Sequence, residues 1–255
     1  MTTEASVAAL VEEGGAGRAD RLRTVDWMRV GSDLDEQGWA VIERLITPEQ
    51  CLELRSLYTI DERNGAAIFR SRVVMARHGF GRGEYKYFDY PLPALLARLR
   101  QTLYPRLAPV ANRWQQALGL ADLFPPGHAE FIARCRAAGQ ARATPLMLRY
   151  GAGDYNCLHQ DLYGAEAFPL QVVLLLSEPG REFEGGEFVM TEQRPRMQTR
   201  PMVLALRQGD AAVIAVHHRP VRGTRGVYRV NLRHGVSRVR WGTRLTAGII
   251  FHDAA

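Results

Sequence analysis

Hydrophobic and polar positions change their pattern near residue 140. From there to the end, the chain consists of short runs rich in β-prone side chains, and turn-forming Gly, Pro or Asp residues separate these runs. Such runs predict strands, at 146–150, 170–176, 187–191, 203–206, 211–216, 227–232, 236–240 and 245–251. About eight short strands at near-regular spacing are typical of a double-stranded β-helix, the cupin-like jelly roll. We therefore expect residues 141–255 to form this β core.

Residues 21–140 predict a mostly helical region that supports the β core. The elements expected there are a strand at 39–42, a helix that begins at Thr47, and helices at 94–118 and 128–138. Thr47 and Gln50 form a capping-box pattern, with Pro48 in the first turn. Residues 1–20 predict a flexible tail, because the run 12–17 is too small and polar to pack. The expected fold class is mainly β with N-terminal helices, α+β, in one integrated domain.

The segment 69–90 departs from this helical pattern. Basic residues alternate there with aromatic ones, and three glycines lie within five positions. Aromatic rings can stack on bases while Arg and Lys bind phosphates, and glycine hinges suit a mobile substrate lid. The alternative is an ordinary hairpin, in which 70–76 pairs with 84–90 and extends the sheet. A hairpin of this kind could also contact the substrate, so the two interpretations are compatible. The candidate substrate-contacting residues are Arg72, Arg77, Tyr85, Lys86 and Tyr87.

Composition narrows the class of protein. Of 255 residues, 46% are hydrophobic and 24% charged, which is ordinary for a globular chain and excludes collagen, coiled coil and disorder throughout. No apolar run is long enough to span a membrane, and the start does not resemble a secretory signal. Three scattered cysteines argue against a disulfide framework. We expect a cytoplasmic protein with no obligate protein partner.

The net charge of the whole chain is +6, and its basic residues are concentrated in one part. Between Arg194 and Arg244 there are 12 arginines and a single acid, Asp210. Such a band fits a polyanion such as DNA or RNA. The alternative is a solvated sheet face, because the chain uses arginine nearly everywhere and Lys86 is its only lysine.

Three side chains suggest a metal site. On a strand, positions i and i+2 face the same way, so His159 and Asp161 can offer an imidazole and a carboxylate to one ion. This H-x-D pattern is weak alone, and His234, 75 residues later on a late strand, offers a third ligand. Two histidines and one carboxylate form the facial triad of non-haem Fe(II) oxygenases, which leaves open positions for other ligands.

A possible cosubstrate site follows this triad. Arg244 lies ten residues after His234, and Thr246 shares its face of the strand. An arginine fork and a hydroxyl match a carboxylate in an apolar pocket, and the far carboxylate of 2-oxoglutarate would fit. Tyr150 could donate a further hydrogen bond.

Two other motifs have simpler interpretations. His217 and His218 are adjacent, so on a strand at most one could reach the iron, and we expect neither to be a ligand. The glycines of Glu184–Glu187 predict a tight turn or bulge with unusual dihedral angles, whose effect on catalysis would be indirect.

These motifs together resemble the 2-oxoglutarate- and Fe(II)-dependent dioxygenases of the prolyl-hydroxylase/AlkB-like superfamily. More closely, the runs 149–161, 183–196 and 223–253 are similar to a prokaryotic family of nucleic-acid oxygenases described as oxidising alkylated DNA. The similarity covers most of the chain after about residue 35. It implies Fe(II), 2-oxoglutarate and O2 as cofactors, and a role in DNA repair on modified bases in DNA or RNA.

One position and one spacing differ from the pattern of the alkylation-repair enzymes. Those enzymes carry an Asn two residues before the cosubstrate-binding Tyr, where this chain has Leu148, and the spacing from His234 to Arg244 resembles prolyl hydroxylases. One alternative is therefore the same chemistry on a peptide or amino acid. Another is a non-catalytic jelly roll that binds nucleic acid and holds no iron.

Overall fold

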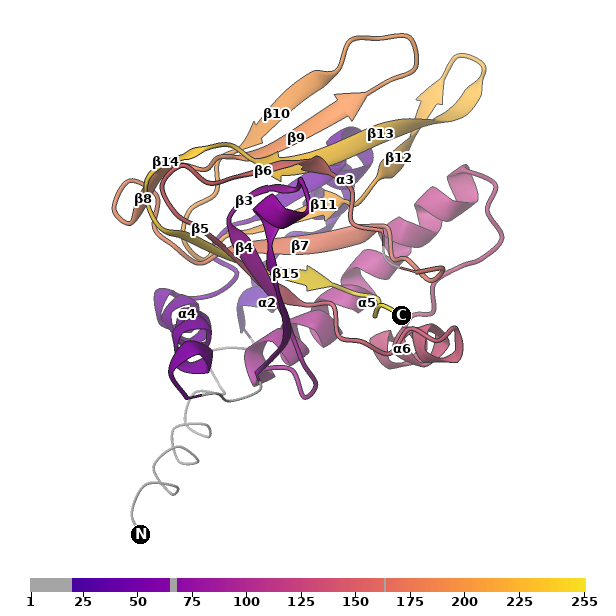
Figure 1. The fold of residues 1–255 in the computed structure, drawn as a ribbon. Coiled ribbons are helices and arrows are strands. Elements are labelled where there is room, and N and C mark those ends of the chain that lie inside the picture. Colours follow the sequence, from indigo (N-terminus) through magenta and orange to yellow (C-terminus); the bar gives the residue numbers. More distant parts are fainter. Residues whose placement is uncertain (1–19, 65–67, 163) are drawn as a thin grey trace.

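Two β-sheets of the chain lie face to face, and helices pack against the larger one (Figure 1). The structure is a computed structural model that describes residues 20–64, 68–162 and 164–255. The tail expected at residues 1–20 lies outside these ranges, apart from its last residue. The facing sheets form the expected double-stranded β-helix.

The larger sheet has seven strands, and all its neighbours pair antiparallel. Its order in space is β1 (Trp39–Ile42), β11 (Ala211–Ala215), β7 (Leu170–Leu175), β15 (Arg244–Ile250), β5 (Leu146–Tyr150), β4 (Glu84–Phe88) and β2 (Phe69–Val74). Strands from the first 140 residues therefore belong to the same sheet as those of the β core.

The smaller sheet faces the larger one and carries the long hairpins at the top of Figure 1. Its order is β10 (Arg200–Leu204), β9 (Phe188–Gln193), β13 (Gly226–Val236), β6 (Tyr155–His159) and β3 (Gly81–Arg82), with β12 (His218–Gly223) also paired with β13. A separate two-stranded sheet joins β14 (Val239–Gly242) to β8 (Phe183–Gly185).

Three helices lie where the sequence predicts them: α4 (Pro48–Asn64), α5 (Ala94–Ala117) and α6 (His128–Ala137). The structure adds α2 (Asp20–Thr24), α3 (Trp27–Gln37) and a 3-10 turn, η1 (Met75–Arg77), which the sequence pattern did not predict. The capping box of α4 is confirmed, because the backbone N–H of Gln50 donates to Thr47 Oγ1 and the backbone N–H of Thr47 donates to Gln50 Oε1. In the part of the chain described, no helix has the length and apolarity to cross a bilayer.

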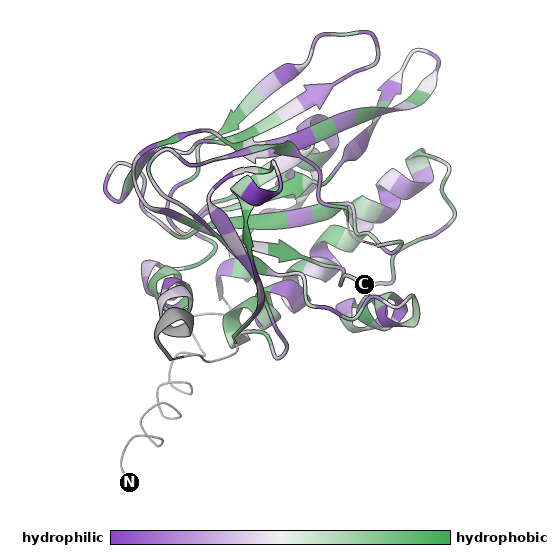
Figure 2. Cartoon of the chain, in the orientation of Figure 1, coloured by the Kyte–Doolittle hydropathy of each residue, from purple (hydrophilic) through white to green (hydrophobic). Residues whose placement is uncertain are grey.

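The core lies around the middle of the larger sheet. Strands β7 and β11 are buried along their whole length, and Figure 2 shows hydrophobic residues gathered on these central strands. Each of the eight strands expected after residue 140 overlaps an observed one. The structure adds β6, β8 and β12, which were not among these eight.

The hairpin expected at 69–90 is confirmed, since β2 pairs with β4 and β4 pairs with β5 at the edge of the larger sheet. The structure gives a steric reason for two of its glycines, Gly81 and Gly83. Both have positive φ, and an added Cβ would lie 2.4 Å from Tyr155 O at Gly81 and 2.9 Å from Arg149 O at Gly83. Glycine is needed here because the loop packs tightly against β5 and β6.

Candidate active site

His159 and His234 lie directly opposite each other in the antiparallel ladder of β6 and β13. Opposite residues in such a ladder project from the same face of the sheet. The two ring centroids are therefore only 4.3 Å apart, although the residues are far apart in the sequence.

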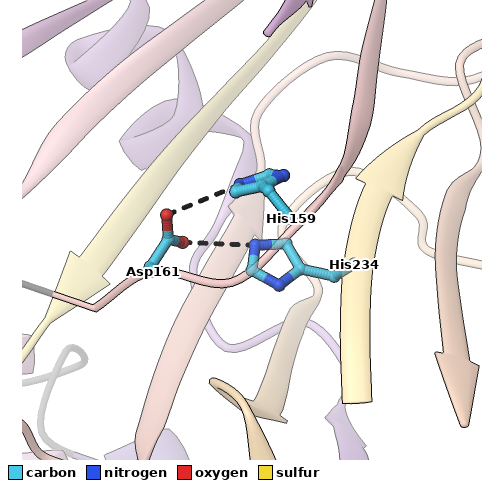
Figure 3. A group of neighbouring side chains, drawn as sticks. All are labelled: His159, Asp161 and His234. Carbon is cyan, nitrogen blue, oxygen red and sulfur yellow. Dashed lines mark ion pairs between the residues drawn. The ribbon is translucent and has the colours of Figure 1, made fainter. Parts of the chain in front are cut away.

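Asp161 completes the group, but it does not lie on the strand as the H-x-D argument assumed. Strand β6 ends at His159, and Asp161 lies in the segment that follows. Its Oδ1 is 3.5 Å from His159 Nε2 and its Oδ2 is 3.2 Å from His234 Nε2 (Figure 3). One ligand atom from each residue lies within 4.8 Å of the others, and no second such group occurs among the described residues.

Hydrogen bonds determine which atoms of this group face one another. His159 Nδ1 is 2.8 Å from Cys157 O, so Nδ1 donates to that carbonyl and Nε2 faces Asp161. Burial alone would raise the pKa of Asp161, but hydrogen bonds with both histidines hold it well below its usual value, in the carboxylate form that binds metals. Burial lowers the pKa of His234 and favours its neutral form, whereas Asp161 outweighs burial and raises the pKa of His159. A metal ion at this site would take the place of the proton on His159 Nε2.

Gln171 is a polar neighbour of this group that sequence reasoning missed. Its Nε2 is 2.8 Å from Asp161 Oδ2 and 3.2 Å from His234 Nε2. Its place in the sequence could have indicated a functional role, because it is the single polar residue in the apolar strand β7.

A pocket of about 400 Å³ opens onto these side chains. Its walls are mainly apolar and aromatic, and include Phe80, Tyr85, Tyr87, Leu148 and Val173. Arg244 is the only lysine or arginine among the described residues that line it. The pocket can therefore hold a flat or apolar group beside one cation.

Arg244 is buried in this pocket without an anionic partner. It lies opposite Tyr150 in the ladder of β15 and β5 and is 1% exposed. Its Nε and Nη1 have no hydrogen-bond partner, and within the described ranges no carboxylate pairs with it. Burial lowers its pKa to about 10. A buried guanidinium whose Nε and Nη1 have no hydrogen-bond partner is costly, so this geometry fits an anionic ligand.

Tyr150 and Thr246 line the same pocket. Thr246 is buried two residues after Arg244 on β15. The Tyr150 hydroxyl accepts a hydrogen bond from Asn156 Nδ2 at 3.2 Å, and burial raises the pKa of Tyr150. The structure thus brings the three expected cosubstrate residues and the three expected metal ligands into one cavity.

The turn at Gly185 and Gly186 has the expected unusual dihedral angles, with φ of +74° and +61°. The structure adds a reason for the second glycine. A Cβ on Gly186 would lie 2.8 Å from Arg244 Cδ, so the turn packs directly on the arginine stem.

The candidate substrate residues divide between two faces of the hairpin. Tyr85 and Tyr87 line the pocket. The expectation is wrong for Lys86, which alternation places on the opposite face, buried with its Nζ 4.2 Å from the Tyr58 ring centroid. It is also wrong for Arg72, which pairs with Lys86 in the ladder and forms an ion pair with Glu84 on that face.

Arg77 does not line the pocket but lies close in the chain to residues that do. It is exposed in η1, two residues before Gly79, which lines the pocket. Arg82 is exposed on the other side of Phe80. Phe80 itself is 47% exposed and stacks with His78 at a centroid distance of 5.3 Å.

Arg244 is the only arginine of the band from Arg194 to Arg244 that lines the pocket. Along β13, Val230, Leu232 and His234 are buried, while the alternate residues Arg229 and Arg233 are exposed on the outer face of the smaller sheet. Arg219, by contrast, is buried in an ion pair with Glu192, whose Oε2 lies 2.6 Å from Arg219 Nη2. For Arg229 and Arg233, the interpretation as a solvated sheet face is confirmed.

His217 and His218 do not belong to the group formed by His159, Asp161 and His234. Their rings are 3.6 Å apart, and burial lowers the pKa of each to about 4. The backbone carbonyl of His217 accepts a hydrogen bond from Gln160, which also donates to Leu232 O. The His217 backbone thus helps to hold the segment next to Asp161.

Comparison with solved structures supports the fold. An oxidoreductase of the 2OG-Fe(II) oxygenase family from Burkholderia pseudomallei superposes with a TM-score of 0.51 at 17% identity, over 91% of this chain and 94% of that one. A Trichoplax adhaerens prolyl hydroxylase, in complex with a hypoxia inducible factor peptide fragment, gives 0.53 at 14%, over 95% and 94%. Both share the double-stranded β-helix.

Comparison of sequences identifies the family. The uncharacterized protein Rv2227 of Mycobacterium tuberculosis is 44% identical over 206 residues, which is 81% of this chain and 84% of that protein. The Oxygenase-NA family, described as "Oxygenase, catalysing oxidative methylation of damaged DNA", matches residues 83–254. The chain therefore belongs to the Oxygenase-NA family and is an oxidoreductase.

Proposed function

We propose that this protein is an Fe(II)- and 2-oxoglutarate-dependent dioxygenase that hydroxylates or demethylates a modified base in nucleic acid. His159, Asp161 and His234 would hold the iron, and Arg244, Thr246 and Tyr150 would bind the far carboxylate of 2-oxoglutarate. The observation that carries this proposal is the unpaired, buried guanidinium of Arg244 in the same pocket as a His–Asp–His group.

The chemistry follows from these groups. With 2-oxoglutarate and O2, such a centre oxidises a substrate C–H bond to C–OH while the cosubstrate becomes succinate and CO2. The chain's own contribution is to hold the three ligands together and to exclude water with apolar walls. On an N-methyl group, the hydroxylated product would release formaldehyde.

The edge of the pocket supports a nucleic-acid substrate. The exposed Phe80 could stack on a base, and Arg77 and Arg82 beside it could contact phosphates. Tyr85 and Tyr87 lie within the pocket, where an extruded base would enter. The family description, which names damaged DNA, agrees with this choice. We also infer a cytoplasmic location, since all three cysteines are free.

One observation favours a second candidate, hydroxylation of a peptide or amino acid. Arg229 and Arg233 face away from the pocket, so they do not add to a polyanion surface around it. Purified protein should first be titrated with Fe(II) and 2-oxoglutarate without oxygen, following the metal-to-ligand absorption band. Succinate formation is then screened across modified oligonucleotides, peptides and amino acids. Stimulation by peptides alone would replace the nucleic-acid proposal with this second candidate.

A further inference from the structure

Gln171 is an unusual residue for its place in the fold. It is the only polar residue of β7, paired with Ile214 on one side and Ile250 on the other, and it is 4% exposed. Burying an amide among apolar side chains costs free energy unless its polar atoms are satisfied. A residue that only filled this volume could be apolar.

The contacts of Gln171 connect the two sheets at the candidate metal site. Its Nε2 is 2.8 Å from Asp161 Oδ2. A carboxylate can only accept hydrogen bonds, so the NH2 end of the amide must face Asp161. Asp161 lies beyond the end of β6, outside the ladder that fixes His159 and His234. Its carboxylate therefore depends on side-chain contacts for its orientation.

The other end of the amide confirms which contact orients it. Gln171 Oε1 is buried and has no hydrogen-bond partner among the residues described. If the side chain served packing alone, nothing would favour the NH2 end facing Asp161. The hydrogen bond to Asp161 thus determines the orientation of the amide.

We propose that Gln171 is a positioning residue of the metal centre, which holds the Asp161 carboxylate toward the two histidines. This inference rests on the proposed function, because it assumes that His159, Asp161 and His234 bind a metal. Residues that hold a metal ligand in place typically change metal affinity about 10- to 100-fold when replaced. Gln171 should belong to this class.

The test uses Co(II), whose absorption spectrum reports both affinity and ligand geometry. Gln171→Leu and Gln171→Met remove the amide at similar volume, and two variants guard against one that fails to fold. We expect Co(II) to bind about 10- to 100-fold more weakly, with an altered visible spectrum for the residual complex. A merely structural role would leave that spectrum unchanged.

Gln208→Leu is a matched control. Gln208 donates its Nε2 to Leu176 O at 2.9 Å, just past the other end of β7, and does not line the pocket. It should bind Co(II) like the wild type. Wild-type affinity and spectrum in both Gln171 variants would overturn this inference alone. If the wild-type protein binds no Co(II) or Fe(II), the proposed function fails as well.

Discussion

Gly186 packs against Arg244, and a side chain at position 186 would force the arginine to shift. An added Cβ would lie 2.8 Å from Arg244 Cδ and 2.9 Å from Val239 Cγ2, at a φ of +61°. The glycine turn, which belongs to the link between β8 and β9, therefore sets the position of the guanidinium in the pocket.

Gly186→Ala should consequently weaken 2-oxoglutarate binding while Fe(II) binding persists, because the new methyl group displaces the arginine stem. The positive φ should also lower the free energy of unfolding by about 1 kcal/mol or more. Gly180→Ala is the control, since its φ is +79° but nothing lies within 4 Å of the added Cβ. Isothermal titration of both variants separates backbone strain from the steric clash. Equal cosubstrate affinity in the two would contradict this prediction.

Arg244→Met should have opposite effects on binding and stability. It removes a charge-assisted contact worth about 1.5–3 kcal/mol, so the 2-oxoglutarate affinity of the Fe(II)-loaded variant should fall roughly 10- to 150-fold. It also removes a buried unpaired charge, so the ligand-free protein should become more stable by about 1–3 kcal/mol. Arg229→Met, on the outer face, should change neither quantity. Unchanged 2-oxoglutarate affinity in Arg244→Met would rule out Arg244 as the anchor.

His159→Ala should abolish stoichiometric Fe(II) binding, because it removes one of three converging ligands. His217→Ala tests the adjacent histidine pair and should retain full binding if the protein still folds. Metal content after anaerobic loading and desalting measures both. Full iron occupancy in His159→Ala would refute the proposed triad.

Two arginine pairs test where nucleic acid binds. Arg77→Gln with Arg82→Gln should weaken binding of single-stranded DNA, and the log-log salt slope should decrease by about one for each phosphate that the protein no longer neutralises. Arg229→Gln with Arg233→Gln removes the same charge from the outer face and should have a much smaller effect. Fluorescence anisotropy across a salt series distinguishes them. A larger effect in the second pair would move the binding surface to the smaller sheet.

Acid should destabilise the protein through its buried histidines. Burial lowers the pKa of His128 and His252 to about 4, and His252 Nδ1 accepts a hydrogen bond from the Phe168 amide. The unfolded chain then binds more protons below about pH 6.5, so stability is full above that pH and falls toward pH 4. His252→Asn keeps an acceptor without titrating and should show a smaller decrease in stability between pH 6.5 and 4. Denaturant melts at several pH values measure this.

The amino-acid sequence by itself determined the elements whose cause is local. The capping box of α4 needs only Thr47 and Gln50, which lie one helical turn apart. The hairpin of β2 and β4 and the strands of the core follow from alternation and turn residues. The pairing of His159 with His234 could be anticipated because both lie on strands of one jelly roll, where an inward position is set by a period of two.

Only the tertiary structure decided which face each remaining side chain meets. The registry of β13 turns Arg229 and Arg233 outward, and that of β4 places Lys86 against Tyr58 instead of in the pocket. The contacts of Gln171 with Asp161, and of Gly186 with Arg244, join segments that no sequence spacing relates. Such contacts depend on how the two sheets and their loops pack, and packing is a property of the whole chain rather than of any local pattern.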